Sequence, residues 1–142
     1  MAEKYSPSIL VDVVHKGLTP PNCDVTLQIS ATYAEGGVAK GIWKVDDPFI
    51  NGIGVAMGGF VASAADIMMA YAISSVLTED QTFASIDLHT TFHMSFHSHL
   101  ESRLHSPLNC FVRLSDWILL VPDPLQQKLR LLWQYPMQIV RY

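Results

Sequence analysis

The sequence predicts an α+β fold in which an antiparallel β-sheet wraps around a long central α-helix. Three segments predict this architecture: a β-hairpin at residues 25–45, an apolar helix at 60–77 and an alternating strand at 83–96. Strands that alternate polar and apolar residues need one face covered, and a long apolar helix provides that cover. The chain has 142 residues, a length that suits one domain able to bury its core without disulfides or a structural metal.

The hairpin is predicted from alternation and from its turn. Apolar and polar residues alternate from residue 25 to residue 31, which is typical of a half-buried strand. Gly36 and Gly37 tolerate the positive φ of a tight turn, and the second strand is expected to end at Val45. Pro48 and four glycines in the segment 46–59 then favour a loop over a regular helix or a long strand.

The helix is predicted from Phe60 to Leu77 because this segment is rich in Ala and contains no Gly or Pro. Its length would be about 27 Å. The apolar stretch 53–77 would also suit a membrane span, but it contains Asp66 near its midpoint. A carboxylate there costs about 2.5–3.5 kcal/mol on insertion scales, so a helix buried inside a domain is favoured.

The strand at 83–96 has the most regular pattern in the chain. Its odd positions from Ser85 to Ser95 are all polar, and its even positions are apolar except for Thr90, which predicts one face on the core. The apolar positions are Ala84, Ile86, Leu88, Phe92, Met94 and Phe96. The rest of the chain is less regular: 111–121 and 129–142 are candidate strands, and the Leu-rich part around 125–135 suits a short helix equally well.

Charge and cysteine content narrow the class of protein. Nine Lys+Arg and 13 Asp+Glu give a formal net charge of -4 without a basic run, which argues against nucleic acid as a partner. Cys23 and Cys110 are too few for a disulfide framework or a Cys-based zinc site, so a reducing compartment is expected, the cytoplasm first and the mitochondrion second. The first ten residues lack the apolar run of a secretory signal.

Several motifs occur together at fixed intervals: Phe49-Ile50-Asn51, Gly52 and Gly54, the pair Gly58-Gly59, Asp66 in the helix and the strand segment ASIDLHTTF. This combination resembles the hotdog-fold acyl-CoA thioesterases of the phenylacetic-acid-pathway type. The resemblance covers about residues 10–97 and implies one hotdog domain over 1–142. The segment 98–142 does not fit the family's pattern of two further strands with glycine-bearing turns, so it is either a divergent end or the product of an altered reading frame or splice junction.

The resemblance implies a hydrolase of lipid metabolism that cleaves a fatty or aromatic acyl-CoA without metal or cofactor. The family's oxyanion donor corresponds to the N–H of Gly58, and its carboxylate, acting as nucleophile or general base, corresponds to Asp66. Asn51 would orient the attacking group, and Ser85 matches the family's active-site hydroxyl. These roles suit the chemistry, because negative charge develops on the thioester oxygen and a helix N-terminus offers unpaired N–H groups.

Two further residues are expected to contact the substrate. Gly59 leaves bare backbone beside Gly58, and Met57 stands where the family usually has His, whose hydrogen bond a thioether cannot donate. Asp66 lies about 10 Å along the helix from Gly59, too far for one thioester carbon to touch both. We therefore expect a homodimer or dimer of dimers, with Gly58 of one subunit and Asp66 of its neighbour in each site.

Plainer interpretations stand beside these. Asn51 is equally a turn residue, the glycines can serve close packing, Ser85 can lie on a strand surface, and Met57 favours a catalytically impaired domain that binds acyl groups or assembles. The methionines at 57, 68 and 69 fit an acyl tunnel or an ordinary core. The histidines at 89, 93, 97, 99 and 105 are not expected to bind a metal, since residues four apart on a strand are about 13 Å apart.

Overall fold

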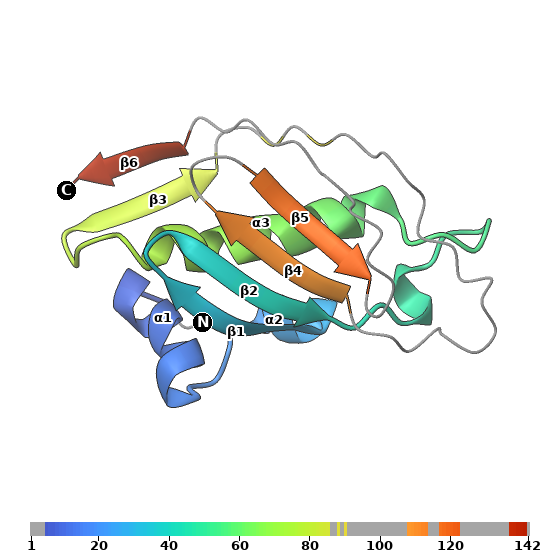
Figure 1. Ribbon diagram of the computed structural model, residues 1–142, viewed down its shortest axis with the longest axis horizontal. Helices are drawn as coiled ribbons and strands as arrows, with labels where there is room; N and C mark the ends of the chain where they lie inside the picture. Colours follow the sequence, from blue (N-terminus) through green and yellow to red (C-terminus); the bar gives the residue numbers. More distant parts are fainter. Residues whose placement is uncertain are drawn as a thin grey trace.

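A 17-residue helix, α3 (Gly58–Ser74), lies across one face of an antiparallel sheet in the computed structural model (Figure 1). The structure describes residues 5–85, 88, 90, 108–113, 117–122 and 137–141. Two short helices, α1 (Pro7–Lys16) and α2 (Asn22–Leu27), precede the sheet. The α+β architecture with a central helix, predicted from the sequence, is confirmed.

Four strands form the main sheet in the order β1-β2-β4-β5, and every neighbouring pair is antiparallel. Their bounds are Ile29–Glu35 for β1, Val38–Trp43 for β2, Leu108–Arg113 for β4 and Trp117–Pro122 for β5. Strand β3 (Gln81–Ser85) pairs with β6 (Met137–Arg141) in a second, two-stranded sheet. The segment that follows residue 97, which does not fit the family's sequence pattern, therefore contributes three strands.

The hairpin turn forms as predicted. Gly36 and Gly37 have φ values of 54° and 78°, in the left-handed region that favours glycine, and Glu35 pairs with Val38. The backbone N–H of Gly37 donates to the hydroxyl of Ser75 at 2.9 Å, and this hydroxyl donates to the Ala72 carbonyl at 2.7 Å. The turn is thus fastened to the C-terminal end of α3.

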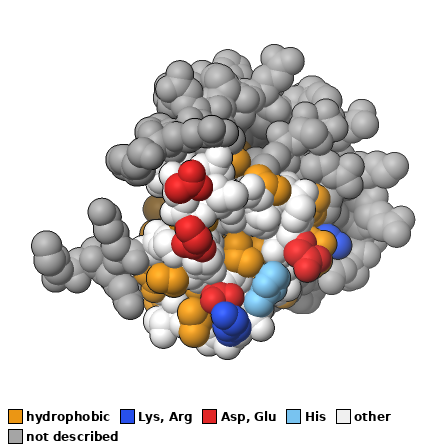
Figure 2. Space-filling model, turned by 90° about the vertical axis from the view of Figure 1, so that its left-hand side faces the viewer, with side chains coloured by type: hydrophobic (Ala, Val, Ile, Leu, Met, Phe, Trp, Pro, Cys, Tyr) orange, Lys and Arg blue, Asp and Glu red, His pale blue; other side chains and the backbone are white. Residues whose placement is uncertain are grey.

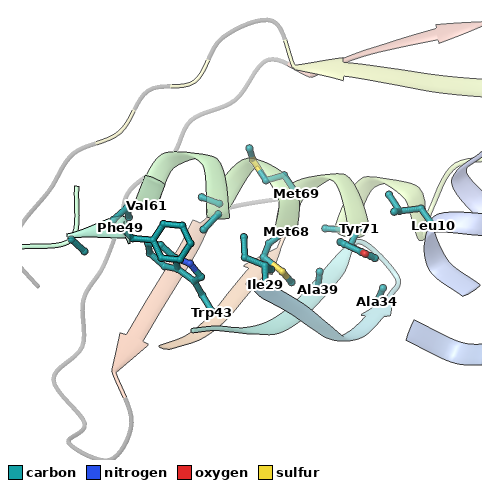
Figure 3. Close-up of a cluster of buried hydrophobic side chains, with 14 residues drawn as sticks. Leu10, Ile29, Ala34, Ala39, Trp43, Phe49, Val61, Met68, Met69 and Tyr71 are labelled. Carbon is teal, nitrogen blue, oxygen red and sulfur yellow. The ribbon is translucent and has the colours of Figure 1, made fainter. Parts of the chain in front are cut away.

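The core lies between α3 and the main sheet (Figure 3). Nine of the 17 residues of α3 are buried, so the helix is apolar around most of its circumference. Trp43, Phe49 and Phe60 form an aromatic cluster with ring centroids 5.9 Å and 5.2 Å apart. Met68 lies against Gly41 of β2, where a Cβ atom would be 2.8 Å from the Met68 sulfur.

The N-terminal helices were not predicted, and the predicted strand at 25–31 was wrong in its first part. Val25 and Leu27 belong to α2, and β1 begins only at Ile29. Start signals for both helices are present in the sequence: Ser6 caps α1 with Pro7 in its first turn, and Pro21 precedes α2. The alternation was misleading because α2 has only six residues, too few to display a helical period.

Further element boundaries differ from the prediction, including the end of β2 at Trp43 instead of Val45. Helix α3 starts at Gly58 instead of Phe60 and ends at Ser74 instead of Leu77. Its two glycines lie in the first turn, where the N–H groups have no intrahelical acceptor. Strand β3 starts at Gln81, and Ala84, predicted to face the core, is exposed; the strand pairs with β6 in the two-stranded sheet. Residues 86–96 lie outside the described residues except Leu88, which packs against the core, and Thr90.

The described surface is mixed in character. Figure 2 shows acidic, basic and histidine side chains interspersed with hydrophobic ones on one face, with basic side chains next to acidic ones. Within the described part of the chain, no helix is long and apolar enough to cross a membrane. The apolar stretch that contains Asp66 is a helix of the domain core.

Candidate active site

The structure brings Asp66 and Ser85 together. Asp66 projects from the middle of α3 and is half-buried, and the exposed Ser85 ends β3. The Ser85 hydroxyl donates a hydrogen bond to Asp66 Oδ1 at 2.7 Å, although the two residues are 19 positions apart. A hydroxyl that donates to a carboxylate both orients it and leaves its second oxygen available, as a nucleophile or general base requires.

Asp66 lies on the least buried stripe of α3. Gly59, Ser63 and Asp66 are spaced by four and three residues, so they share one side of the helix, and each is exposed or half-buried. The Ser63 hydroxyl donates to the Gly59 carbonyl at 2.9 Å, which leaves the amide of Gly59 unaffected. A substrate that approaches this side would meet the first turn of the helix and the carboxylate in turn.

The N-terminus of α3 offers two unused donors. Met57 is the N-cap, and its carbonyl accepts from the N–H groups of Phe60 and Val61 at 2.9 Å and 3.2 Å. The amides of Gly58 and Gly59 have no acceptor among the described residues. Such N–H groups at the positive end of a helix are suited to an anionic oxygen.

The backbone of Met57 is fixed by a hydrogen bond, whereas its side chain is exposed. Its N–H donates to the carbonyl of the buried Phe49 at 2.9 Å, whereas its side chain is 45% exposed. The terminal methyl lies near Gly59, 3.4 Å from where a Cβ atom on that residue would be. Met68 and Met69, in contrast, are buried in the hydrophobic core.

Asn51 stabilises the loop before α3. Its side-chain oxygen accepts hydrogen bonds from the N–H groups of Ile53 and Val55, both at 3.1 Å. Because both partners are donors, the oxygen faces the loop and the amide nitrogen points elsewhere, without an acceptor in the described part of the chain. Asn51 is therefore a turn residue whose NH₂ group is still free for a ligand.

The predicted site residues form two groups in one subunit. Asp66 and Ser85 are in contact, while Gly58, Gly59, Met57 and Asn51 gather at the start of α3. Eight residues separate Gly58 from Asp66, or about 12 Å along the helix axis. One copy of the chain thus carries two groups of candidate residues, separated by more than the size of a thioester group.

No metal site accompanies these groups in the described residues, where no three His, Cys, Asp or Glu side chains cluster. The five histidines between positions 89 and 105 lie outside the described residues.

One buried polar cluster escaped prediction from the sequence. Asp24 of α2 is 2% exposed, and its carboxylate accepts hydrogen bonds from the Tyr71 hydroxyl at 2.5 Å and from the Cys23 thiol at 3.3 Å. Burial raises the pKa of the Asp24 carboxyl, and burial together with Asp24 raises the pKa of Tyr71. A lone Asp in a polar stretch gave no signal of burial, because its partner is 47 residues away.

Comparison with known proteins places the architecture. The sequence matches no family model and no curated protein. Among solved structures, the chain is similar to the PaaI protein of the phenylacetic acid degradation operon of E. coli, with a TM-score of 0.63 and 20% identity over 78% of this chain and 82% of that one. Thioesterase HI1161 of Haemophilus influenzae also gives a TM-score of 0.63, at 14% identity, and covers 99% of this chain and 94% of its own.

The chain has the hotdog fold. The fold predicted from Asn51, the glycine pair, Asp66 and the strand after the helix is thereby confirmed. Because the match to HI1161 covers 99% of the chain, the similarity of fold extends past residue 97, where the resemblance in sequence ends. In this hotdog domain, α3 is the central helix, and both groups of candidate site residues lie on it or beside it.

Proposed function

We propose that this hotdog protein is an acyl-CoA thioesterase that hydrolyses a fatty or aromatic acyl-CoA in a reducing compartment, the cytoplasm. The observation that carries the proposal is the hydrogen bond of the Ser85 hydroxyl to Asp66, on the helix whose first two amides have no acceptor among the residues that the structure describes. A solved neighbour of the same fold, described as a hypothetical thioesterase from Streptococcus pneumoniae with coenzyme A, supports the substrate class; its TM-score is 0.62 at 11% identity.

Asp66 starts the reaction in this proposal. Its carboxylate either attacks the thioester carbon or removes a proton from an attacking water. In the second case a C–O bond forms, the C–S bond breaks, and the proton from water passes through Asp66 to the sulfur of the leaving CoA. Ser85 is a positioning residue, since its hydroxyl contacts the carboxylate and fixes its orientation.

The N–H of Gly58 stabilises the developing oxyanion. Donors that are already oriented before the reaction cost no rearrangement, and loss of one such donor typically lowers kcat by about 10²–10³-fold. Gly59 keeps the approach unobstructed, and the free NH₂ group of Asn51 orients the attacking group. Because Gly58 and Asp66 of one chain are about 12 Å apart, the complete site combines Gly58 of one subunit with Asp66 of another.

Met57 is proposed to contact the acyl group next to the reacting carbonyl. Its thioether is apolar, flexible and 45% exposed. Since a thioether donates no hydrogen bond, this contact favours acyl groups that are apolar near the carbonyl.

Hydrolysis of a panel of short, long and aromatic acyl-CoAs by three proteins tests the function. We expect the wild type to release CoA, and Asp66→Ala to lose at least about 10²-fold in kcat. Gly58→Pro is expected to lose a similar factor, because it removes the N–H while Pro suits the first turn of a helix. Met57, with φ -66° and ψ 130°, has the extended backbone that precedes Pro well.

Two controls keep this experiment specific. Gly58→Ala retains the N–H group, and Asp12→Asn removes a carboxylate from the surface of α1, where Asp12 pairs with Lys16. Asp12→Asn should hydrolyse the substrates like the wild type, and Gly58→Ala should retain more activity than Gly58→Pro, because only the Pro variant lacks the N–H. Equal rates in the wild type and Asp66→Ala would refute the assignment.

The alternative is a non-catalytic hotdog domain that binds acyl groups or mediates assembly. Met57 in the place of a hydrogen-bonding residue is the observation that favours it. Background hydrolysis by the wild type, combined with binding of a non-hydrolysable S-alkyl-CoA thioether measured by calorimetry, would support this function over catalysis.

A further inference from the structure

The buried carboxyl of Asp24 lies between α2 and α3, away from the residues proposed for catalysis. Asp24 and Tyr71 are 2% and 1% exposed, and the Tyr71 hydroxyl donates to Asp24 Oδ2 at 2.5 Å. The other oxygen, Oδ1, accepts from the Cys23 thiol at 3.3 Å, a weak donor. This carboxyl is the main polar link between α2 and the central helix in the described residues.

Within the described part of the chain, Asp24 accepts from two neutral donors and belongs to no ion pair that the structure shows. Ion pairs join Lys16 to Asp12 and Lys44 to Asp46, and neither includes Asp24. Among the described titratable groups, Cys23 on its own helix and Tyr71 on α3 face Asp24, and Tyr5 contributes electrostatically beyond Tyr71. A buried carboxylate with two neutral donors and no cation is costly to keep ionised.

We propose that Asp24 and Tyr71 form a proton-linked latch, in which uptake of one proton by the Asp24 carboxyl strengthens the attachment of α2 to α3. The protonated group keeps its acceptor oxygen for the Tyr71 hydroxyl. Its new O–H faces the Cys23 sulfur. The thiol, which donates to the ionised carboxylate, then acts as a weak acceptor. The link between the helices therefore persists while the buried charge is removed.

The sign of the pH effect follows from the two states. In the unfolded chain Asp24 titrates near its ordinary pKa of 3.8, and burial raises that pKa in the folded chain. Between the two values only the folded chain holds the proton, so the folded state gains stability as pH falls through this window. Above the folded pKa the contribution is constant at its least favourable value, and below 3.8 no further gain occurs.

Urea unfolding of the full chain at several pH values between 4 and 8 tests the latch. Asp24→Asn carries no charge and still offers an oxygen to Tyr71, so it should unfold at a higher urea concentration than the wild type at pH 8. We expect this difference to shrink as the pH is lowered, because the wild type then takes up its proton. Asp12→Asn is the matched control on the exposed side of α1, and its difference from the wild type should not show this dependence.

If Asp24→Asn fails to fold, NMR titration of the Asp24 carboxyl in the wild type tests the proposal directly. The ¹³C chemical shift of the Asp24 carboxyl in the folded wild type should titrate above 3.8, and in Tyr71→Phe, which lacks the donor, at a still higher pH. Titration at or below 3.8, or an Asp24→Asn difference that is independent of pH, would overturn the proposal. Neither measurement involves hydrolysis, so the latch and the proposed enzymatic function stand or fall separately.

Discussion

At the scale of single residues, the contact of Ser85 with Asp66 is the most informative feature of the site. The two residues occur at intervals that resemble a thioesterase family, but the sequence slightly favoured a surface serine of the strand. The 2.7 Å hydrogen bond favours a role in orienting the Asp66 carboxylate, because a serine that contacted only solvent would not donate to this group. For Asn51 the structure favours the turn interpretation, since its side-chain oxygen accepts hydrogen bonds from the loop backbone.

Ser85→Ala is expected to lower kcat about tenfold and to leave KM nearly unchanged. The reason is that a hydrogen bond to a charged group contributes about 1.5–3 kcal/mol, and its loss leaves Asp66 less well oriented without removing it. Steady-state kinetics with the best acyl-CoA of the panel measures both parameters.

Ser85→Thr serves as the control because it restores the hydroxyl, and activity should return to near the wild-type level. A rise in KM with constant kcat in Ser85→Ala would instead assign Ser85 to substrate binding and contradict the positioning role.

At the scale of elements, the close approach of α3 to β2 determines where the central helix lies. Gly41 has no side chain, and Met68 fills the space that a Cβ atom would take. The Ser30 carbonyl of β1 is nearly as close, at 2.9 Å from that position, so the backbone of the neighbouring strand also limits the space. Glycine here serves packing, not a positive φ, and the sequence pattern of the hairpin gave no indication of this.

Gly41→Ala is therefore expected to destabilise the protein by about 1–3 kcal/mol, the usual cost of overpacking a core. The Met68 side chain can move, whereas the Ser30 carbonyl belongs to the sheet ladder and cannot move far. The free energy of unfolding from urea titration at a fixed pH measures the effect.

Gly52→Ala is the matched control for Gly41. A Cβ atom at Gly52 would meet nothing within 4 Å, and the residue has no positive φ. Its free energy of unfolding should change little, and an equally large loss there would show that the cost at Gly41 does not come from the contact with Met68.

At the scale of the whole molecule, the proposed site requires more than one chain. Two halves of the site occur on each copy, with Gly58 at the first turn of α3 and Asp66 in contact with Ser85 about 12 Å further along. In a two-fold dimer, Gly58 of each subunit would lie next to Asp66 of the other, so the dimer would contain two complete sites.

Mixing two inactive variants tests this sharing. If Gly58→Pro and Asp66→Ala subunits are unfolded together in equal amounts and refolded, half of the resulting dimers contain one of each. One site of such a dimer carries both defects and the other carries none, so about one quarter of the wild-type activity should return.

Each variant refolded by itself is the control, and it should stay at background. A mixture that also stays at background, although mass spectrometry shows mixed dimers, would place the complete site within one subunit.

The sequence by itself determined the elements whose signals are local. The glycine pair of the hairpin turn, the Gly- and Pro-containing loop, and the apolar segment of α3 follow from backbone preferences and periodicity, and they suffice to predict an antiparallel sheet wrapped around a central helix. The hotdog fold itself was implied by the resemblance to a known family. Only the tertiary structure decided which polar residues meet: Asp66 with Ser85, 19 residues on, and Asp24 with Tyr71, 47 residues on. The physical reason is that burial and hydrogen bonding of a side chain depend on segments distant in the sequence, whose packing no local pattern records.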